Sequence, residues 1–282
     1  MQNRRQQHLS YIYAWFLVFV TPFAVPLAVI TAWQGKVTKI DILCAFTMYC
    51  ISGLGITLGY HRLVTHRAFQ AKPWLRKILL IAGSFAMQGS PASWASLHIQ
   101  HHRFADKQHD PHSPHQKGFW HAHCGWIFHG YKPDFRRFGK WLPKDPEVKH
   151  VSKYYLYYSN LGLLIPWLLC GWMGLLWAGL LRLFLTCHMT WSINSICHRF
   201  GKRAYTGTAD QSTNHFLIAL LTFGEGWHNN HHRHLQMPFL GHRWFEIDMG
   251  KWALLILQKC GWVWDLKIPK HFTSYEKSNS TL

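Results

Sequence analysis

Two short stretches of the sequence place three histidines at the same spacing. They are HIQHH, with His98, His101 and His102, and HNNHH, with His228, His231 and His232. Because residues at i, i+3 and i+4 share one side of an α-helix, each stretch would present three imidazoles toward one point. Neutral imidazole is a good ligand for first-row transition metals. The repeated spacing therefore predicts a metal site.

Two further motifs, HRLVTH and NSICH, extend this set with His61, His66, Asn194 and His198. His61 and His66 are five residues apart, about 140° around a regular helix. That separation suits two neighbouring metal ions better than one, unless the helix frays there. No carboxylate has ligand spacing beside the histidines, which argues against a ferritin-like di-iron site. A zinc hydrolase normally uses three protein ligands and would leave most of these histidines unused.

The elements that must position these histidines are expected to be membrane helices. Of the 282 residues, 49% are hydrophobic and only 15% are charged, and a bilayer-spanning helix needs roughly 20 predominantly apolar residues. The apolar runs predict four transmembrane helices in two hairpins, at about 11–33, 41–60, 155–171 and 173–196. The fold class is therefore an all-α, multi-pass integral membrane protein, with residues 1–282 as a single domain.

A further uncharged segment, 78–97, is expected not to cross the bilayer. It is rich in glycine and serine and contains a proline, so we interpret it as interfacial or re-entrant. Lysine and arginine gather in the chain after Tyr60 and after the last apolar run. The positive-inside tendency then puts the histidines and both termini, with Arg4 and Arg5, on the cytoplasmic side. There, residues 61–153 and 198–282 would form a helical cap that holds the metal site.

Charge and cysteine content narrow the choice of partners. Basic residues outnumber acidic ones by 30 to 12, for a formal charge of +18. That charge alone could indicate nucleic acid, anionic lipid or an acidic partner, but the apolar runs favour the lipid bilayer and no nucleic acid is expected. The seven cysteines form no CxxC pair, so neither a disulfide framework nor a thiolate site is indicated. Isolated histidines such as His112 are interpreted as part of a basic surface.

Six motifs together resemble those of the membrane-bound fatty acyl desaturases, specifically the stearoyl-type Δ9 group. In chain order they are HRLVTHRAF, HIQHHRFAD, DPHSP, GFWHAHCGW, TWSINSICHRFG and GEGWHNNHH, between about Gly53 and about Pro238. The histidine boxes are common to all non-haem di-iron membrane oxygenases of this class. The NxxxH and GEGxHNxHH elements are more specific to the Δ9 branch. The resemblance implies an oxygen-dependent oxidoreductase that introduces a cis double bond, expected at Δ9, into a saturated acyl chain.

The resemblance also implies a set of site residues. Two irons would be held by His61, His66, His98, His101, His102, His198, His228, His231 and His232, with Asn194 acting through a water, and O₂ would be the co-substrate. Trp94 and Trp191 precede ligands by four and seven residues, and we expect them in the catalytic tunnel near the bend of the acyl chain. Candidates for orienting the imidazoles are Asp106, Asp110, Glu225 and Asn229.

The implied partners are a saturated fatty acyl substrate and a separate electron donor. The donor would be of ferredoxin or cytochrome type with its reductase, because the sequence has no haem domain, CxxC pair or dinucleotide fingerprint. The acyl group could be carried on CoA, a carrier protein or a lipid. Relatives that use acyl-CoA place basic residues where this chain has Ser96 and Gly130-Tyr131, so the carrier is left open.

Two rival functions are weighed against this interpretation. A fatty acyl or lipid hydroxylase or ketolase of the same histidine-box class would share the iron chemistry but form a C–OH product. A metal transporter would place its ligands near mid-membrane along a pathway, whereas these histidines gather at one membrane face. The NxxxH and GEGxHNxHH elements favour the desaturase.

Overall fold

The computed structural model describes residues 11–269, and the part it describes is mostly helical. The α-helices are α2 (Ala24–Trp33), α3 (Lys39–Leu54), α4 (Pro73–Ser84), α5 (Pro91–Phe104), α6 (Pro114–Lys117), α7 (Phe119–His123), α8 (Pro146–Lys153), α9 (Tyr155–Gly174), α10 (Arg182–Ser195), α11 (Phe216–Leu221), α12 (His228–Arg233) and α13 (Met249–Lys259). Three π-helices are η1 (Phe16–Val20), η3 (Gly55–Thr65) and η6 (Leu175–Leu181), and three 3₁₀ turns are η2 (Thr21–Phe23), η4 (Gly125–His129) and η5 (Leu142–Lys144). Two short strands, β1 (Gln70–Ala71) and β2 (Val263–Trp264), pair antiparallel. Arg4 and Arg5 lie outside the described residues.

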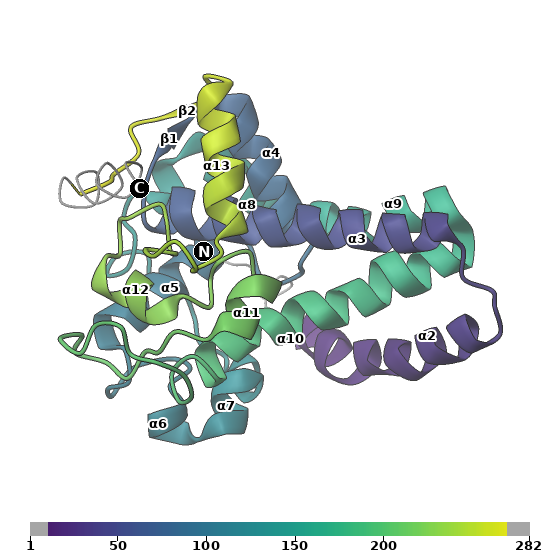
Figure 1. Ribbon diagram of the computed structural model, residues 1–282, viewed down its shortest axis with the longest axis horizontal. Coiled ribbons are helices and arrows are strands. Elements are labelled where there is room, and N and C mark those ends of the chain that lie inside the picture. Colours follow the sequence, from purple (N-terminus) through teal and green to yellow (C-terminus); the bar gives the residue numbers. More distant parts are fainter. Residues whose placement is uncertain (1–10, 270–282) are drawn as a thin grey trace.

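Within residues 11–269, three helical stretches are long and apolar enough to cross a membrane: Tyr11–Trp33, Lys39–Thr65 and Tyr155–Ser195. The first coincides with the predicted segment, and the second extends the predicted 41–60 through η3. The third covers both remaining segments in one assignment, but Cys170 and Gly171 inside it have non-helical backbone angles. Figure 1 shows α2, α3, α9 and α10 extending together to one side of the molecule.

The outer surface of these helices is apolar. Trp33, Phe46 and Leu169 are all more than 60% exposed, and contiguous apolar surface of this kind marks a membrane or protein contact. By contrast, the buried side chains of α10 include an arginine. Arg182 is 1% exposed and donates to the carbonyls of Ala178, Phe85 and Gly162. All three hydrogen bonds of this buried guanidinium are made to backbone oxygens.

The predicted interfacial segment 78–97 is not one continuous helix. It comprises the end of α4, an irregular stretch and the start of α5, and Met87 and Gly89 in the stretch have φ of 55° and 99°. Side chains from neighbouring helices satisfy its backbone: Arg182 donates to Phe85 O, and Gly89 N donates to Tyr155 Oη. Irregular backbone at membrane depth is tolerated where it is buried in protein. The position of this segment relative to the bilayer stays a prediction.

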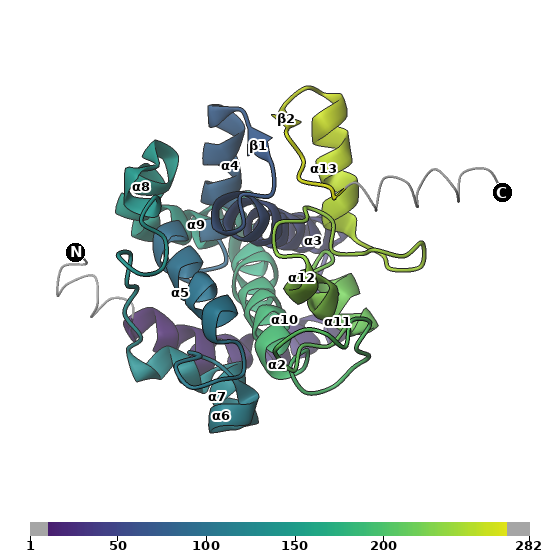
Figure 2. The same cartoon turned by 90° about the vertical axis from the view of Figure 1, so that its left-hand side faces the viewer.

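The remaining elements surround the end of the α3–η3 helix. Figure 2 looks nearly along α3, with α4 and α13 on one side of it and α5 and α12 on either side below. The largest apolar cluster lies here and includes Leu58, Leu63, Leu80, Leu142 and Leu254. The β1–β2 pair ties the chain after α13 to the segment that leads into α4. The histidine-bearing helices are therefore fixed on a packed core.

Candidate metal centre

All nine predicted histidines come together in two groups. The group of five contains His61, His66, His98, His102 and His231, and the group of four contains His101, His198, His228 and His232. In each group the potential ligand atoms lie within 4.8 Å of one another. His61 and His231, whose Nε2 atoms are in contact, lie 170 residues apart in the chain. The sequence prediction of which histidines converge agrees with this geometry.

The two HxxHH stretches contribute to both groups in opposite ways. His98 and His102 belong to the group of five and His101 to the group of four, whereas His228 and His232 belong to the group of four and His231 to the group of five. On an α-helix, i and i+4 differ by about 40°, but i+3 and i+4 differ by about 100°. The expectation that each stretch points at one place is therefore wrong, because each helix lies between two places.

His61 and His66 belong to the same group because their helix is not a regular one. They lie at the end of the π-helix η3, where His66 N donates to His61 O at 3.0 Å, the i→i+5 bond of a π-turn. Their ring centroids are 4.6 Å apart. The regular-helix expectation, which separated the two rings by about 140° and favoured two different ions, is wrong for this reason. Fraying of the helix, the other possibility considered, is not what the structure shows: the backbone hydrogen bonds continue there as a π-helix.

The nitrogen atoms converge as they would around a cation. In the group of five, the Nε2–Nε2 distances are 3.1 Å for His61–His231, 3.0 Å for His231–His102 and 2.9 Å for His102–His98. In the group of four they are 3.0 Å for His198–His228, 3.0 Å for His228–His232 and 3.4 Å for His101–His232. The buried Nε2 atom of His66 has no hydrogen-bond partner. These residues therefore fit a pair of metal ions held by imidazole nitrogen.

Four carboxylates contact the opposite ring nitrogens. The Nδ1 contacts are His61–Glu225 at 2.6 Å, His101–Asp110 at 3.0 Å, His198–Asp106 at 2.8 Å and His232–Asp210 at 3.0 Å. Such a contact holds the proton on Nδ1 and directs the Nε2 lone pair inward. Glu225, Asp106 and Asp110 were predicted, whereas Asp210 was missed. Nothing local in TGTADQST indicates that Asp210 reaches His232, 22 residues away.

Burial and these contacts set the charges of the site. Burial alone would raise the pKa of Asp106, but the hydrogen bond and charge of His198 outweigh it and lower that pKa to about 2. The pKa values of Asp110, Asp210 and Glu225 are also lowered. Burial lowers the pKa of His232 to about 4, and burial, followed by neighbouring histidines, lowers those of His66, His98, His102, His228 and His231. Burial also acts to lower the pKa of His101, but Asp110, together with Asp106 and Asp210, outweighs it and raises that pKa. Ionised carboxylates and mostly neutral imidazoles are the protonation states that metal binding requires.

Two predicted roles for polar side chains differ from the structure. Asn229 was a candidate for orienting an imidazole, but its amide instead contacts Tyr205, Thr208 and Ser212. It therefore fixes the loop that carries Asp210. His112 was interpreted as a surface residue, but it is buried, with its ring centroid 4.4 Å from that of His101. That interpretation is wrong because Asp110 of the DPHSP segment pairs with His101 of α5, which brings His112 against the His101 ring.

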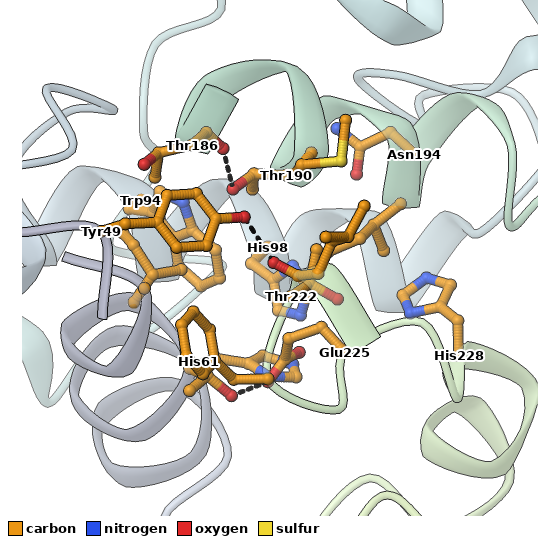
Figure 3. A pocket seen from close by; sticks show the side chains of 17 residues that line it. Tyr49, His61, Trp94, His98, Thr186, Thr190, Asn194, Thr222, Glu225 and His228 are labelled. Atoms are coloured by element: carbon orange, nitrogen blue, oxygen red, sulfur yellow. Dashed lines mark hydrogen bonds and ion pairs between the residues drawn. The ribbon is translucent and has the colours of Figure 1, made fainter. Parts of the chain in front are cut away.

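Two cavities meet beside the histidines, with volumes of about 50 and 220 Å³. Trp94, His98, Thr190 and Asn194 line both of them. Figure 3 shows the smaller cavity, with Asn194 and Thr190 from α10 on one side and His61 and Glu225 on the other. Trp94 stacks on His98 with ring centroids 4.8 Å apart. Trp191 lines only the larger cavity. Asn194 and Trp94 thus lie where the cavities adjoin the histidines.

Comparison with known proteins identifies the family. The sequence model described as fatty acid desaturase matches residues 40–243. The chain belongs to this family. It is 41% identical over 229 residues to an sn-1 stearoyl-lipid 9-desaturase of Anabaena variabilis, which covers 79% of this chain and 83% of the relative. It is 35% identical to a hex-5-enoyl-[acyl-carrier protein] acetylenase of Moorena producens (86% and 81% covered) and 36% identical to an acyl-CoA C20 Delta5-desaturase of Anemone leveillei (79% and 73%).

Family membership settles the broad function. The protein is a fatty acyl desaturase, an oxidoreductase of lipid metabolism. Its three apolar helical stretches make it a membrane protein, and its histidine groups form a site suited to metal. Membership of the desaturase family excludes the metal transporter considered from the sequence. The hydroxylase or ketolase is not supported either, because the relatives named here are desaturases and an acetylenase.

Proposed function

We propose that this desaturase introduces a cis double bond at Δ9 of a saturated acyl chain, using two irons, O₂ and two external electrons. The observation that carries the proposal is the convergence of nine imidazoles into two adjacent groups beside two cavities. The name of the Anabaena relative supports Δ9 as the bond position. The mostly imidazole donor set suits a first-row transition metal.

The chain's own residues prepare this site in two ways. The groups of five and four would each hold one iron, and Asn194 would hold a water near one of them, as its position beside His98 and His228 allows. When bound, the irons would supply the oxidising chemistry that takes two hydrogens from adjacent methylenes and, with the two external electrons and two protons from water, reduces O₂ to two waters. The protein supplies placement and excludes competing reactions.

The acyl chain would run through both cavities past Trp94. The smaller cavity is lined mainly by apolar surface and includes Ile56, Ile193 and Phe223. The larger one includes Leu17, Met87 and Trp191 and adjoins the first membrane helix. Because the two share Trp94 and Asn194, the methylenes that pass between them would face the histidines. Trp94 and Trp191 would then line the passage near its bend.

The membrane arrangement that fits this function has four crossings in two hairpins. The non-helical break at Cys170 and Gly171 supports it, since α9 and the following η6 pack against each other after that break. Lysine and arginine cluster in the 61–153 and 198–282 parts of the chain. By the positive-inside tendency, this cap, its histidines and both termini would face the cytoplasm. A ferredoxin- or cytochrome-type donor with its reductase would deliver the electrons to this basic surface.

The acyl carrier is proposed to be a membrane lipid. The larger cavity is lined by Tyr13, Ala14 and Leu17 of the first membrane helix, which brings the acyl path next to the bilayer. Among the relatives, the Anabaena enzyme is named for a stearoyl-lipid substrate, whereas others are named for carrier protein or CoA. The residues at Ser96 and Gly130-Tyr131 carry no positive charge for a CoA phosphate.

The decisive experiment is a fatty-acid profile by gas chromatography–mass spectrometry. Cells that express the chain are compared with cells that express His231→Ala, and double bonds are located by derivatisation. A new Δ9 cis monoene that is absent from the mutant supports the proposal, and separation of lipid classes shows whether it is lipid-bound. A hydroxylated product, or purified protein without iron, would refute it.

A further inference from the structure

A buried ionic network lies behind His61 and reaches the C-terminal helix. Arg62 is 1% exposed, and its Nη2 and Nη1 donate to Asp248 Oδ1 at 2.9 Å and Oδ2 at 3.2 Å. Its Nε lies 3.5 Å from Glu225 Oε1, while Glu225 Oε2 lies 2.6 Å from His61 Nδ1. The side chains of Asp248, Arg62, Glu225 and His61 therefore form one continuous series of contacts.

Two members of this network, Arg62 and Asp248, also make hydrogen bonds to backbone from other parts of the chain. Arg62 also donates to Pro238 O at 2.8 Å and Phe223 O at 3.2 Å. Asp248 accepts from Lys251 N, which caps the start of α13, and from Leu240 N. One arginine and one aspartate thus connect the turn before Glu225, the chain after α12 and the start of α13.

The glycines around the network show that it is closely packed. A Cβ added to Gly224 would lie under 3.0 Å from Asp248 Oδ1, and one added to Gly250 would lie under 3.0 Å from Arg62 Nη2. Gly224 also has a φ of 107°, which favours glycine. The first glycine of GEGWHNNHH is therefore required by the contact with Asp248. The backbone next to Glu225 therefore packs directly against the Arg62–Asp248 ion pair.

The group of five depends on Glu225 more than the group of four depends on any one carboxylate. Among the residues that the structure describes, Glu225 is the one carboxylate that contacts a histidine of the group of five, and Thr57 donates to its other oxygen. Three carboxylates, Asp106, Asp110 and Asp210, contact the group of four. An error in the position of Glu225 would have no second carboxylate to compensate for it.

We propose that Arg62 and Asp248 are positioning residues for the metal site of the group of five, acting through Glu225 on His61. The inference rests on the proposed di-iron function. Arg62 sets the place and charge of Glu225, and Glu225 keeps the Nδ1 proton of His61 so that Nε2 faces the metal. Asp248 in turn fixes the guanidinium. Partners of this kind typically change metal affinity by about 10–100-fold when mutated.

The test compares Asp248→Asn with a matched control, Asp145→Asn. Asp145 has the same two local roles, since it caps the start of α8 through Val148 N and pairs with Arg76, but it lies in a different part of the fold. Iron is titrated into purified full-length protein and counted per chain, and Mössbauer spectra are recorded. We expect Asp248→Asn to weaken one of two irons about tenfold and to change only one spectral component. Asp145→Asn should bind both irons as the unmodified protein does.

Equal iron binding and unchanged spectra in Asp248→Asn would overturn the inference, as would equal losses at both irons. If Asp248→Asn does not fold, Arg62→Lys decides the matter, with Arg76→Lys as its control. Lysine keeps the charge but cannot make the forked contacts of arginine, so the same loss at one iron is expected. Failure of the proposed function is recognised separately, because the unmodified chain would then not bind two irons.

Discussion

Replacing Asp210 with asparagine is expected to weaken metal binding without removing a ligand. Asp210 Oδ2 lies 3.0 Å from His232 Nδ1, and Oδ1 accepts from Ser212 N at 2.9 Å. When His232 presents the lone pair of Nε2 to a metal, its Nδ1 carries the proton. His232 Nδ1 and Ser212 N are then both hydrogen-bond donors to Asp210. Asparagine offers one acceptor oxygen and one NH₂ donor, so it can satisfy only one of them.

The size of the effect follows from which partner is left unsatisfied. If the amide oxygen faces Ser212 N, the NH₂ faces His232 Nδ1 and the imidazole proton must move to Nε2, the atom required by the metal. If the oxygen faces His232, two N–H groups oppose each other at Ser212. Loss of such an outer partner typically costs about 10–100-fold in metal affinity, or about 1.4–2.7 kcal/mol.

The assay is competition for iron between the purified protein and a chelator. Asp134→Asn is the matched control, because Asp134 Oδ1 accepts from Arg136 N at 3.0 Å in the same i to i+2 arrangement but caps an exposed turn. We expect Asp210→Asn to release one iron at an at least tenfold lower chelator concentration, with Asp134→Asn unchanged. Equal retention in all three proteins would refute the argument that Asp210 holds the tautomer of His232.

Three further outcomes are expected. Burial lowers the pKa of His232 from 6.5 to about 4, so between these pH values the unfolded chain binds more protons than the folded protein. Stability that is present above pH 6.5 is therefore lost as the pH falls toward 4. Thermal unfolding of the metal-free protein checks this, and the midpoint temperature should fall across this range. Gly224→Ala forces a Cβ against Asp248 at a positive φ and should cost about 1–3 kcal/mol, measured by denaturant unfolding; an unchanged midpoint would contradict it. Tyr49→Ala removes a side chain that lines the smaller cavity and bonds to Leu221 O, so the product profile should shift toward longer acyl chains, and an unshifted profile would show that Tyr49 does not limit the cavity.

The apolar helical stretches and the convergence of the histidines could be predicted because they depend on local patterns. Apolar runs of about 20 residues mark membrane helices wherever they occur, and the break near Gly171 falls where the sequence places it. The histidines could be chosen because their spacing repeats in HIQHH and HNNHH. Both inferences need only the residue types and their separations along the chain.

The partition of the histidines could not be predicted, because it depends on backbone geometry and on packing. The π-helix η3 has no distinctive sequence signal, yet it alone brings His61 and His66 together. Asp210 reaches His232 from the 205–212 loop, which Asn229 holds through Tyr205 and Ser212 and Arg203 holds through Thr208 and Asp210 O. These contacts join segments that spacing rules treat as unrelated.

The two histidine groups are not equivalent, despite sharing one ligand type. The group of four has three carboxylates on its outer side, whereas the group of five has Glu225, whose charge is further offset by Arg62. Negative charge near imidazole raises its basicity and favours a more highly charged metal. Neighbouring histidines of α5 and of α12 belong to different groups. The two groups therefore lie side by side but differ in the charge around them. The difference in charge around the two groups is therefore set by the placement of four carboxylates and one arginine.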